Sequence, residues 1–254
     1  MTANDDGDRR RRGSAMRGWL KATIGLAVLC GLLVGADRIA VGVAEDEAAD
    51  RIVKSGWMNQ KPDVSIEGFP FLTQALSMDL DDVRVTSDNV AVGEGGQKVA
   101  MHAFEAKLSG VRVKDGLSSV TVDSGSGSGV ITYADLAQLL PPASQLVHGK
   151  LPVGSSSRVS LSYGGPGKVK ASLGPLPVGE GTVRTKGNTI TVDGFQLSGL
   201  AGALAGVSGQ QVEPVSLTLD SLPAGLKLAD KDGAVPVEEG LRLAFDGKDV
   251  QLHG

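Results

Sequence analysis

The most specific stretch of this 254-residue chain is PDVSIEGFPFLTQ, residues 62–74. Val64 and Ile66 alternate with polar neighbours, which predicts a strand with one apolar face. The strand runs directly into Gly-Phe-Pro-Phe-Leu at residues 68–72, where Pro70 restricts the backbone and two of the chain's five phenylalanines stand together. Two interpretations remain open: an apolar plug at the end of a core strand, or the mouth of an apolar groove.

The same period-two alternation continues through most of the chain after residue 62. It gives each predicted strand one apolar and one polar face, which is typical of antiparallel rather than buried parallel sheets. Glycine-containing turn signals separate the strands, for example at residues 186–188 and 246–247. Strands are expected within the ranges 64–66, 83–85, 104–108, 111–113, 120–122, 159–163, 169–173, 190–192, 217–219, 226–228, 241–245 and 250–252.

Helices are predicted at three places. Residues 43–55 carry alanines on one face and end at Gly56, and residues 197–207 have a weaker, glycine-interrupted pattern. Thr132 is expected to cap a short helix that carries Leu136, Leu139 and Leu140 and stops at Pro141-Pro142. The Ser-Gly repeat at 124–129 predicts a mobile hairpin connection rather than a domain boundary.

The N-terminus has the pattern of an exported protein. Basic residues at 9–12, 17 and 21 precede the uncharged run ATIGLAVLCGLLVGA, residues 22–36. Positive charge stays in the cytoplasm, so the remainder of the chain is expected outside it. As a helix, fifteen residues span about 22 Å, less than the roughly 30 Å hydrocarbon core. A retained anchor and a signal peptide cleaved near 34–36 or 42–44 both stay open.

The body of the chain is acidic and has no cysteine. Residues before Ala44 include seven basic and four acidic side chains, and the remainder holds 18 basic and 25 acidic ones, a net charge of −7. This charge and the 4% aromatic content argue against nucleic-acid binding. Cys30, the only cysteine, lies inside the apolar run, so no disulfide is expected in the body.

No pattern of catalytic or metal-binding residues is present in the sequence. The three histidines, at 102, 148 and 253, are isolated, and no nucleophile elbow or phosphate-binding loop occurs. Asp79, Asp81 and Asp82 fit the polar face of a strand better than a calcium loop. We therefore expect a protein that is not an enzyme and that needs no cofactor and no metal.

The signature Pro-x-Val-x-Ile-x-Gly-Phe-Pro-Phe-Leu-Thr-Gln, placed after an apolar segment, resembles the LmeA-type phospholipid-binding proteins of actinomycete envelopes. Weaker agreement is found at VRV 111–113, ITYADL 131–136, LPAGL 222–226 and DGKDVQL 246–252. The resemblance implies a tubular lipid-binding fold, in which a long curved antiparallel sheet wraps a helix and encloses an apolar groove. It also implies phospholipid binding, with phosphatidylinositol as the suggested ligand, and a role in building mannosylated envelope glycolipids.

Together these observations predict an α+β, mostly antiparallel β protein. Residues 1–43 form a basic tail with a signal peptide or transmembrane anchor, and residues 44–254 form one extracytoplasmic lipid-binding-like domain. Its expected partners are phospholipid and membrane, and the candidate lipid-binding residues are Ile66, Phe69, Phe71 and Leu72. The alternative function is a membrane-anchored envelope scaffold that binds a protein partner and no lipid.

Overall fold

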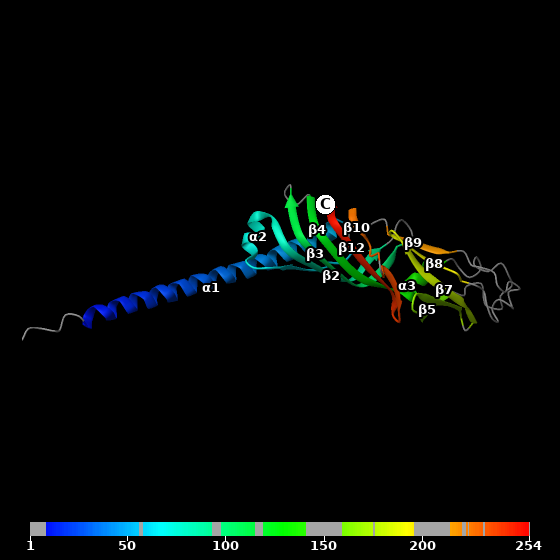
Figure 1. Cartoon of the computed structure of the whole chain (residues 1–254), viewed down its shortest axis with the longest axis horizontal. Helices are drawn as coiled ribbons and strands as arrows, with labels where there is room; N and C mark the ends of the chain where they lie inside the picture. The colour runs from blue at the N-terminus through cyan, green and yellow to red at the C-terminus, as the bar shows by residue number, and fades with distance from the viewer. Residues whose placement is uncertain are drawn as a thin grey trace, which may run out of the picture.

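The structure is a computed structural model that describes residues 9–55, 58–92, 98–114, 119–140, 159–174, 176–195, 214–219, 222, 224–230 and 232–253. A long N-terminal helix leads into a body made mostly of two antiparallel sheets (Figure 1). The predicted α+β class with antiparallel strands is confirmed. Among the described residues, both sheets are open and do not close into a barrel.

Helix α1 spans Arg9–Lys54 without interruption. It therefore joins the apolar run and the helix predicted over 43–55 into one rod. Its large apolar side chains are exposed from Ile24 to Val34, whereas Asp37, Val41 and Ala49 are buried against the body. The helix thus has a free N-terminal part and a C-terminal part that belongs to the protein core.

Sheet A contains seven strands and lies along the C-terminal part of α1 (Figure 1). Helix α2, Phe71–Ser77, connects its first two strands. Strand β11, Ala234–Val237, pairs with β12 outside the main order. That order is β1 (Asp63–Glu67), β2 (Asp79–Val92), β3 (Val99–Lys114), β4 (Ser119–Thr132), β12 (Gly240–His253) and β10 (Ala224–Leu228).

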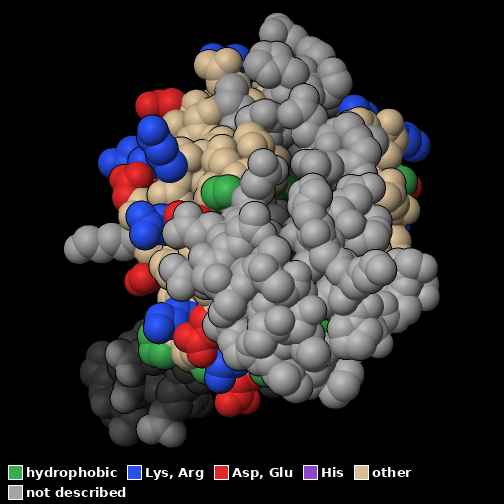
Figure 2. Space-filling model, turned by 90° about the vertical axis from the view of Figure 1, so that its right-hand side faces the viewer, with side chains coloured by type: hydrophobic (Ala, Val, Ile, Leu, Met, Phe, Trp, Pro, Cys, Tyr) green, Lys and Arg blue, Asp and Glu red, His purple; other side chains and the backbone are tan. Residues whose placement is uncertain are grey.

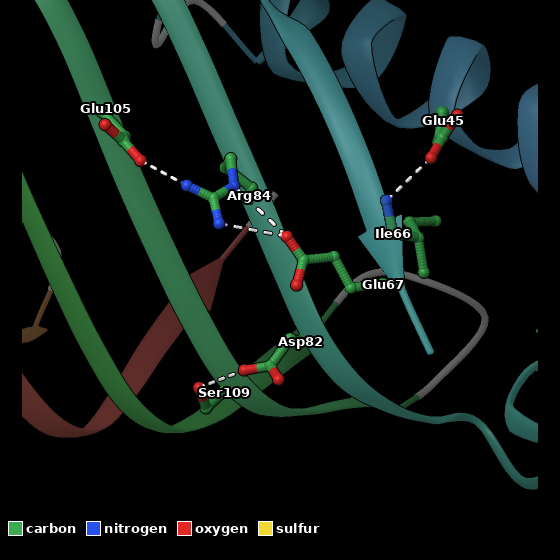
Figure 3. Close-up of polar contacts among 7 residues, drawn as sticks. All are labelled: Glu45, Ile66, Glu67, Asp82, Arg84, Glu105 and Ser109. Atoms are coloured by element: carbon green, nitrogen blue, oxygen red, sulfur yellow. Dashed lines mark hydrogen bonds and ion pairs between the residues drawn. The ribbon is translucent and has the colours of Figure 1, made fainter. Parts of the chain in front are cut away.

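The two faces of sheet A differ in the way that the alternation predicts. On the polar face, Arg84 pairs with Glu67 at 3.1 Å and with Glu105 at 2.5 Å, and Ser109 donates to Asp82 (Figure 3). The three side chains of the ion pairs are 39–52% exposed, so these pairs add little to stability. The apolar face forms one core cluster with Val41 and Ala49 of α1. Sheet A is therefore held to α1 mainly by apolar burial.

The predicted mobile connection at 124–129 is wrong, because this repeat is the middle of strand β4. It pairs with β3 on one side and β12 on the other. The glycines are needed for close packing: a Cβ on Gly127 would lie 3.0 Å from the carbonyl oxygen of Glu105, and one on Gly129 would lie 2.6 Å from Cγ of Met101. The glycine-serine composition thus reflects a tightly packed strand face and not flexibility.

Sheet B has five strands among the described residues. It packs beside sheet A through helix α3, Tyr133–Gln138, and through strand β11, which contacts β5 and β7. As predicted, Thr132 is the N-cap of α3, and its hydroxyl accepts from the Asp135 N–H at 3.1 Å. The predicted stop at Pro141-Pro142 and the helix at 197–207 lie outside the described residues. The strand order is β5 (Val159–Gly165), β6 (Lys168–Leu173), β7 (Leu176–Lys186), β8 (Thr189–Asp193) and β9 (Val215–Thr218).

The packing of β4 predicts how this strand responds to added side chains. Gly127→Val should lower the free energy of unfolding by about 1–3 kcal/mol, because overpacking forces neighbouring atoms to shift. Ser126→Val, one residue earlier on the exposed face, should change it by less than about 0.5 kcal/mol. Denaturant titration of both variants checks this, and equal stabilities would contradict the packing role of Gly127.

Candidate functional site

The 62–74 motif lies where α1, β1 and α2 meet. Its four candidate residues divide into two pairs. Ile66 and Phe71 are buried, with Phe71 only 6% exposed, and both belong to the core cluster. Phe69, 62% exposed, and Leu72 lie on the surface. Ile66 and Phe71 thus agree with the core plug that the sequence allowed, whereas Phe69 and Leu72 form an exposed apolar surface. The groove mouth, the other alternative, stays a prediction.

Two carboxylates of α1 hold the backbone of this motif. Asp37 Oδ1 accepts the Leu72 N–H at 2.8 Å, and Glu45 Oε1 accepts the Ile66 N–H at 2.8 Å (Figure 3 shows the second). Asp37 is 1% exposed, and its other oxygen accepts from Arg38 at 2.8 Å. Charge-assisted bonds of this kind satisfy the carboxylate and fix the motif's position relative to α1.

The turn within the motif is built around Gly68 and Gln74. Gly68 has φ +106°, and a Cβ at this position would lie 2.3 Å from Nε2 of Gln74. The buried Gln74 amide donates to the Glu67 carbonyl at 3.5 Å and accepts the Asp81 N–H at 2.9 Å. These bonds connect α2 to the ends of β1 and β2 and leave no room for a side chain at residue 68.

A second apolar region lies between α3 and sheet B and is bounded also by Leu241 of β12 in sheet A. It is a pocket with about 30 Å³ of open space, and every side chain that lines it is hydrophobic. Several of these side chains, including Leu136, Leu161 and Val183, are only half buried. The lining residues are Leu136, Leu139, Leu140, Leu161, Val169, Val183, Ile190, Val192, Phe195, Leu217 and Leu241.

Sequence reasoning named many of these pocket residues as inward positions of strands or of the short helix, but not as a site. Their only signal is the ordinary apolar alternation, which is the same in a closed core and in a pocket. Asp37 and Glu45 were also missed as specific contacts. In the sequence they are recognisable only as acidic residues, because no local pattern indicates that α1 passes beside residues 66 and 72.

In the described parts of the chain, one polar cluster lies at the start of α3. His102 Nε2 lies 3.0 Å from Asp135 Oδ2, and Thr132 donates to the same oxygen at 2.5 Å. This arrangement completes the cap of α3 and contains no nucleophile aligned with the imidazole. Within the described residues, no three metal-ligating side chains come together.

Tyr133 donates its hydroxyl to the Val237 carbonyl at 2.8 Å, and burial raises its pKa to about 12.

Comparison with protein families adds the deciding observation. The model of the LmeA-like phospholipid-binding family matches residues 35–246. The chain belongs to this family. The match begins two residues before Asp37 and includes the motif, sheet B, sheet A up to the middle of β12, and all of the pocket lining. The resemblance inferred from the motif is thus confirmed, while no curated protein and no solved structure matches the chain.

The division of the motif predicts different effects for its two phenylalanines. Phe71→Ala should lower the free energy of unfolding by about 3–5 kcal/mol, because it leaves a cavity beside Ile66 and α1. Phe69→Ala should lower it by less than about 1 kcal/mol, since only an exposed contact with Arg38 is lost. Chemical denaturation measures both, and a large loss at Phe69 would contradict its surface position.

Proposed function

We propose that this protein is an extracytoplasmic, membrane-attached phospholipid-binding protein that places acyl chain between α3 and sheet B. The observation that carries the proposal is the wholly apolar lining of that pocket in a member of a phospholipid-binding family. Each methylene buried there would contribute about 0.8 kcal/mol. We further propose that the bound lipid serves envelope lipid or lipoglycan biogenesis, with transfer of the lipid as part of that role.

The narrowness of the pocket has a consequence for binding. About 30 Å³ of open space holds only a fragment of an acyl chain, so α3 and sheet B must move apart to admit more. Their contact consists largely of leucine, valine and isoleucine side chains, which can exchange protein contacts for acyl contacts without leaving polar groups unpaired. The proposal includes no catalytic step.

Attachment to the membrane is supported by the length and composition of α1. The part from Ile24 onward is long and apolar enough to cross a membrane, and the basic residues precede it. Cleavage after Ala44 would remove Asp37 and Val41, which are buried in the body. The packing therefore favours a retained anchor or cleavage after Ala36 over cleavage after Ala44.

Basic and acidic side chains are mixed on sheet B near the pocket, so we do not expect lipid binding there to depend strongly on salt concentration. On sheet B, Lys168 and Lys170 lie near Glu180, and Arg184 pairs with Asp193 at 3.3 Å. Figure 2, which views the molecule from its sheet B end, shows basic and acidic side chains interspersed over the described surface. A phosphatidylinositol-like headgroup is suggested by family resemblance and by no particular residue.

The first test compares lipid content among variants of the full chain purified in detergent. Val183→Trp and, separately, Leu161→Trp fill the pocket, whereas Thr182→Trp adds the same ring to the exposed face of β7. Mass spectrometry of organic extracts should show less phospholipid per chain in the two pocket variants than in the control. Lipid surrounding α1 is common to all three variants, so the difference reports on the pocket.

Equal phospholipid in all variants would assign the pocket to ordinary core packing. A folded parent chain whose extract holds no phospholipid would instead favour the alternative function, an envelope scaffold that binds a protein partner.

The second test uses ionic strength. If apolar contact holds the lipid, the phospholipid retained per chain should be nearly the same after washing at about 50 mM and about 500 mM NaCl, although the Debye length falls roughly threefold. Mass spectrometry of the washed samples measures it. Release of most of the lipid at the higher concentration would show that a charged headgroup site dominates binding.

A further inference from the structure

The exposed apolar side chains of the body are concentrated in one place. Outside α1, the described chain exposes five large hydrophobic side chains, and four of them lie within ten residues. Leu76 is 87% exposed and Met78 is 55% exposed, and only Tyr163 lies elsewhere. We define the α2 patch as Phe69, Leu72, Leu76 and Met78. Exposed clusters of this kind mark contact surfaces.

The α2 patch is held beside α1 at the point where the uncharged run ends. The Leu72 N–H bonds to Asp37, the residue directly after Ala36. The Arg38 guanidinium lies 5.6 Å from the centre of the Phe69 ring. Because α1 is one unbroken helix from Arg9 to Lys54, the distance between the patch and the apolar run is fixed. Figure 1 shows α2 beside α1 where the helix leaves the body.

The apolar run by itself is short for a bilayer, and the patch lies where the missing length would be. Fifteen residues span about 22 Å, which leaves roughly 8 Å of a 30 Å hydrocarbon core uncovered. About 8 Å corresponds to five further residues of α1, which reach Val41. Ile39, within these five residues, and Val43, two residues beyond them, are exposed on α1. Helix α2 lies beside this part of α1.

Asp37 and Arg38 are the two charged residues of α1 between Ala36 and Val41, and their arrangement is compatible with a lipid surface. The Asp37 carboxylate is buried beneath α2 and bonded to Leu72 and Arg38, so it is not presented to acyl chains. The Arg38 side chain is half exposed and long enough to reach lipid phosphates while its stem stays in apolar surroundings. The acidic body cannot be drawn to an anionic surface by charge, so contact there needs apolar side chains.

We propose that the α2 patch inserts into the outer leaflet of the bilayer that α1 crosses, and that it completes the membrane-embedded surface of the anchor. The occupant of the patch is the lipid surface itself, because α2 packs beside α1. On α1, exposed apolar side chains extend from Ile24 through Ile39 to Val43. The patch then fixes the depth and the tilt of the body relative to the membrane. This inference rests on the membrane attachment proposed above and not on the pocket at sheet B.

The test places a fluorophore on the patch in the full chain. Cys30→Ser removes the native thiol, and Leu76→Cys or, as the control, Ser162→Cys on exposed β5 provides a single labelling site. Each labelled chain is reconstituted in phosphatidylcholine vesicles that contain lipids brominated near the headgroup end of their acyl chains. Emission at residue 76 should shift to the blue and lose most of its intensity, whereas emission at residue 162 should change little.

Three outcomes would overturn the inference. Equal quenching at both sites means that the body contacts lipid without a preferred face. A label at 76 that is shielded from water but not quenched by lipid means that protein, such as a second copy of the chain, covers the patch. If quenching at residue 76 is unchanged after Phe69→Ser and Leu72→Ser, the fluorophore itself enters the bilayer and the patch does not cause the insertion. Co-sedimentation with the vesicles reports attachment through α1 separately, so failure of the anchor is distinguished from failure of the patch.

Discussion

The position of the 62–74 motif against α1 depends on two carboxylates of that helix. Strand β1 is an edge of sheet A, and Glu45 occupies the Ile66 N–H that the edge would otherwise leave free. Helix α2 begins after Pro70, which has no side chain that can cap, and Asp37 supplies the missing acceptor from another element. Each carboxylate thus accepts a backbone N–H of the motif, from Ile66 or from Leu72, and the same two hydrogen bonds attach the motif to α1.

This attachment explains why the motif needs its particular residues. Gly68 is required because the turn brings the backbone against the Gln74 amide, and Gln74 is required because it connects the ends of β1 and β2. Phe71 enters the core because the turn points it there, and the same turn leaves Phe69 outside beside Arg38. The apolar residues of the motif are therefore divided by the turn into a buried part with Phe71 and an exposed part with Phe69.

The sequence predicted the parts of the structure that depend on local periodicity. Alternation from Val64 onward identified the antiparallel strands, and the Thr132 cap located α3 within a residue or two. The turn predicted at residues 246–247 is wrong, because these residues pair with β4 inside strand β12. Prediction also failed at residues 124–129, because a glycine-serine repeat has the composition of a linker while its role here is set by Met101 and by the Glu105 backbone on the neighbouring strand. Asp37 and the sheet B pocket could not be predicted for the same reason: each depends on which distant segments become neighbours, and no local pattern records that.

The two apolar regions lie at opposite ends of the body. Helix α2 is at the end where α1 leaves the body, whereas α3 and sheet B are at the far end (Figure 1). If α1 and α2 are placed in one bilayer, the pocket is held away from that bilayer by the length of sheet A. A lipid in the pocket would then have to travel along the apolar face of sheet A, where Phe104 and Leu108 are only partly buried, or arrive from another surface or protein. On the two proposals above, attachment and lipid binding use opposite ends of the body, and that arrangement would suit delivery of lipid across a gap better than extraction at the anchor.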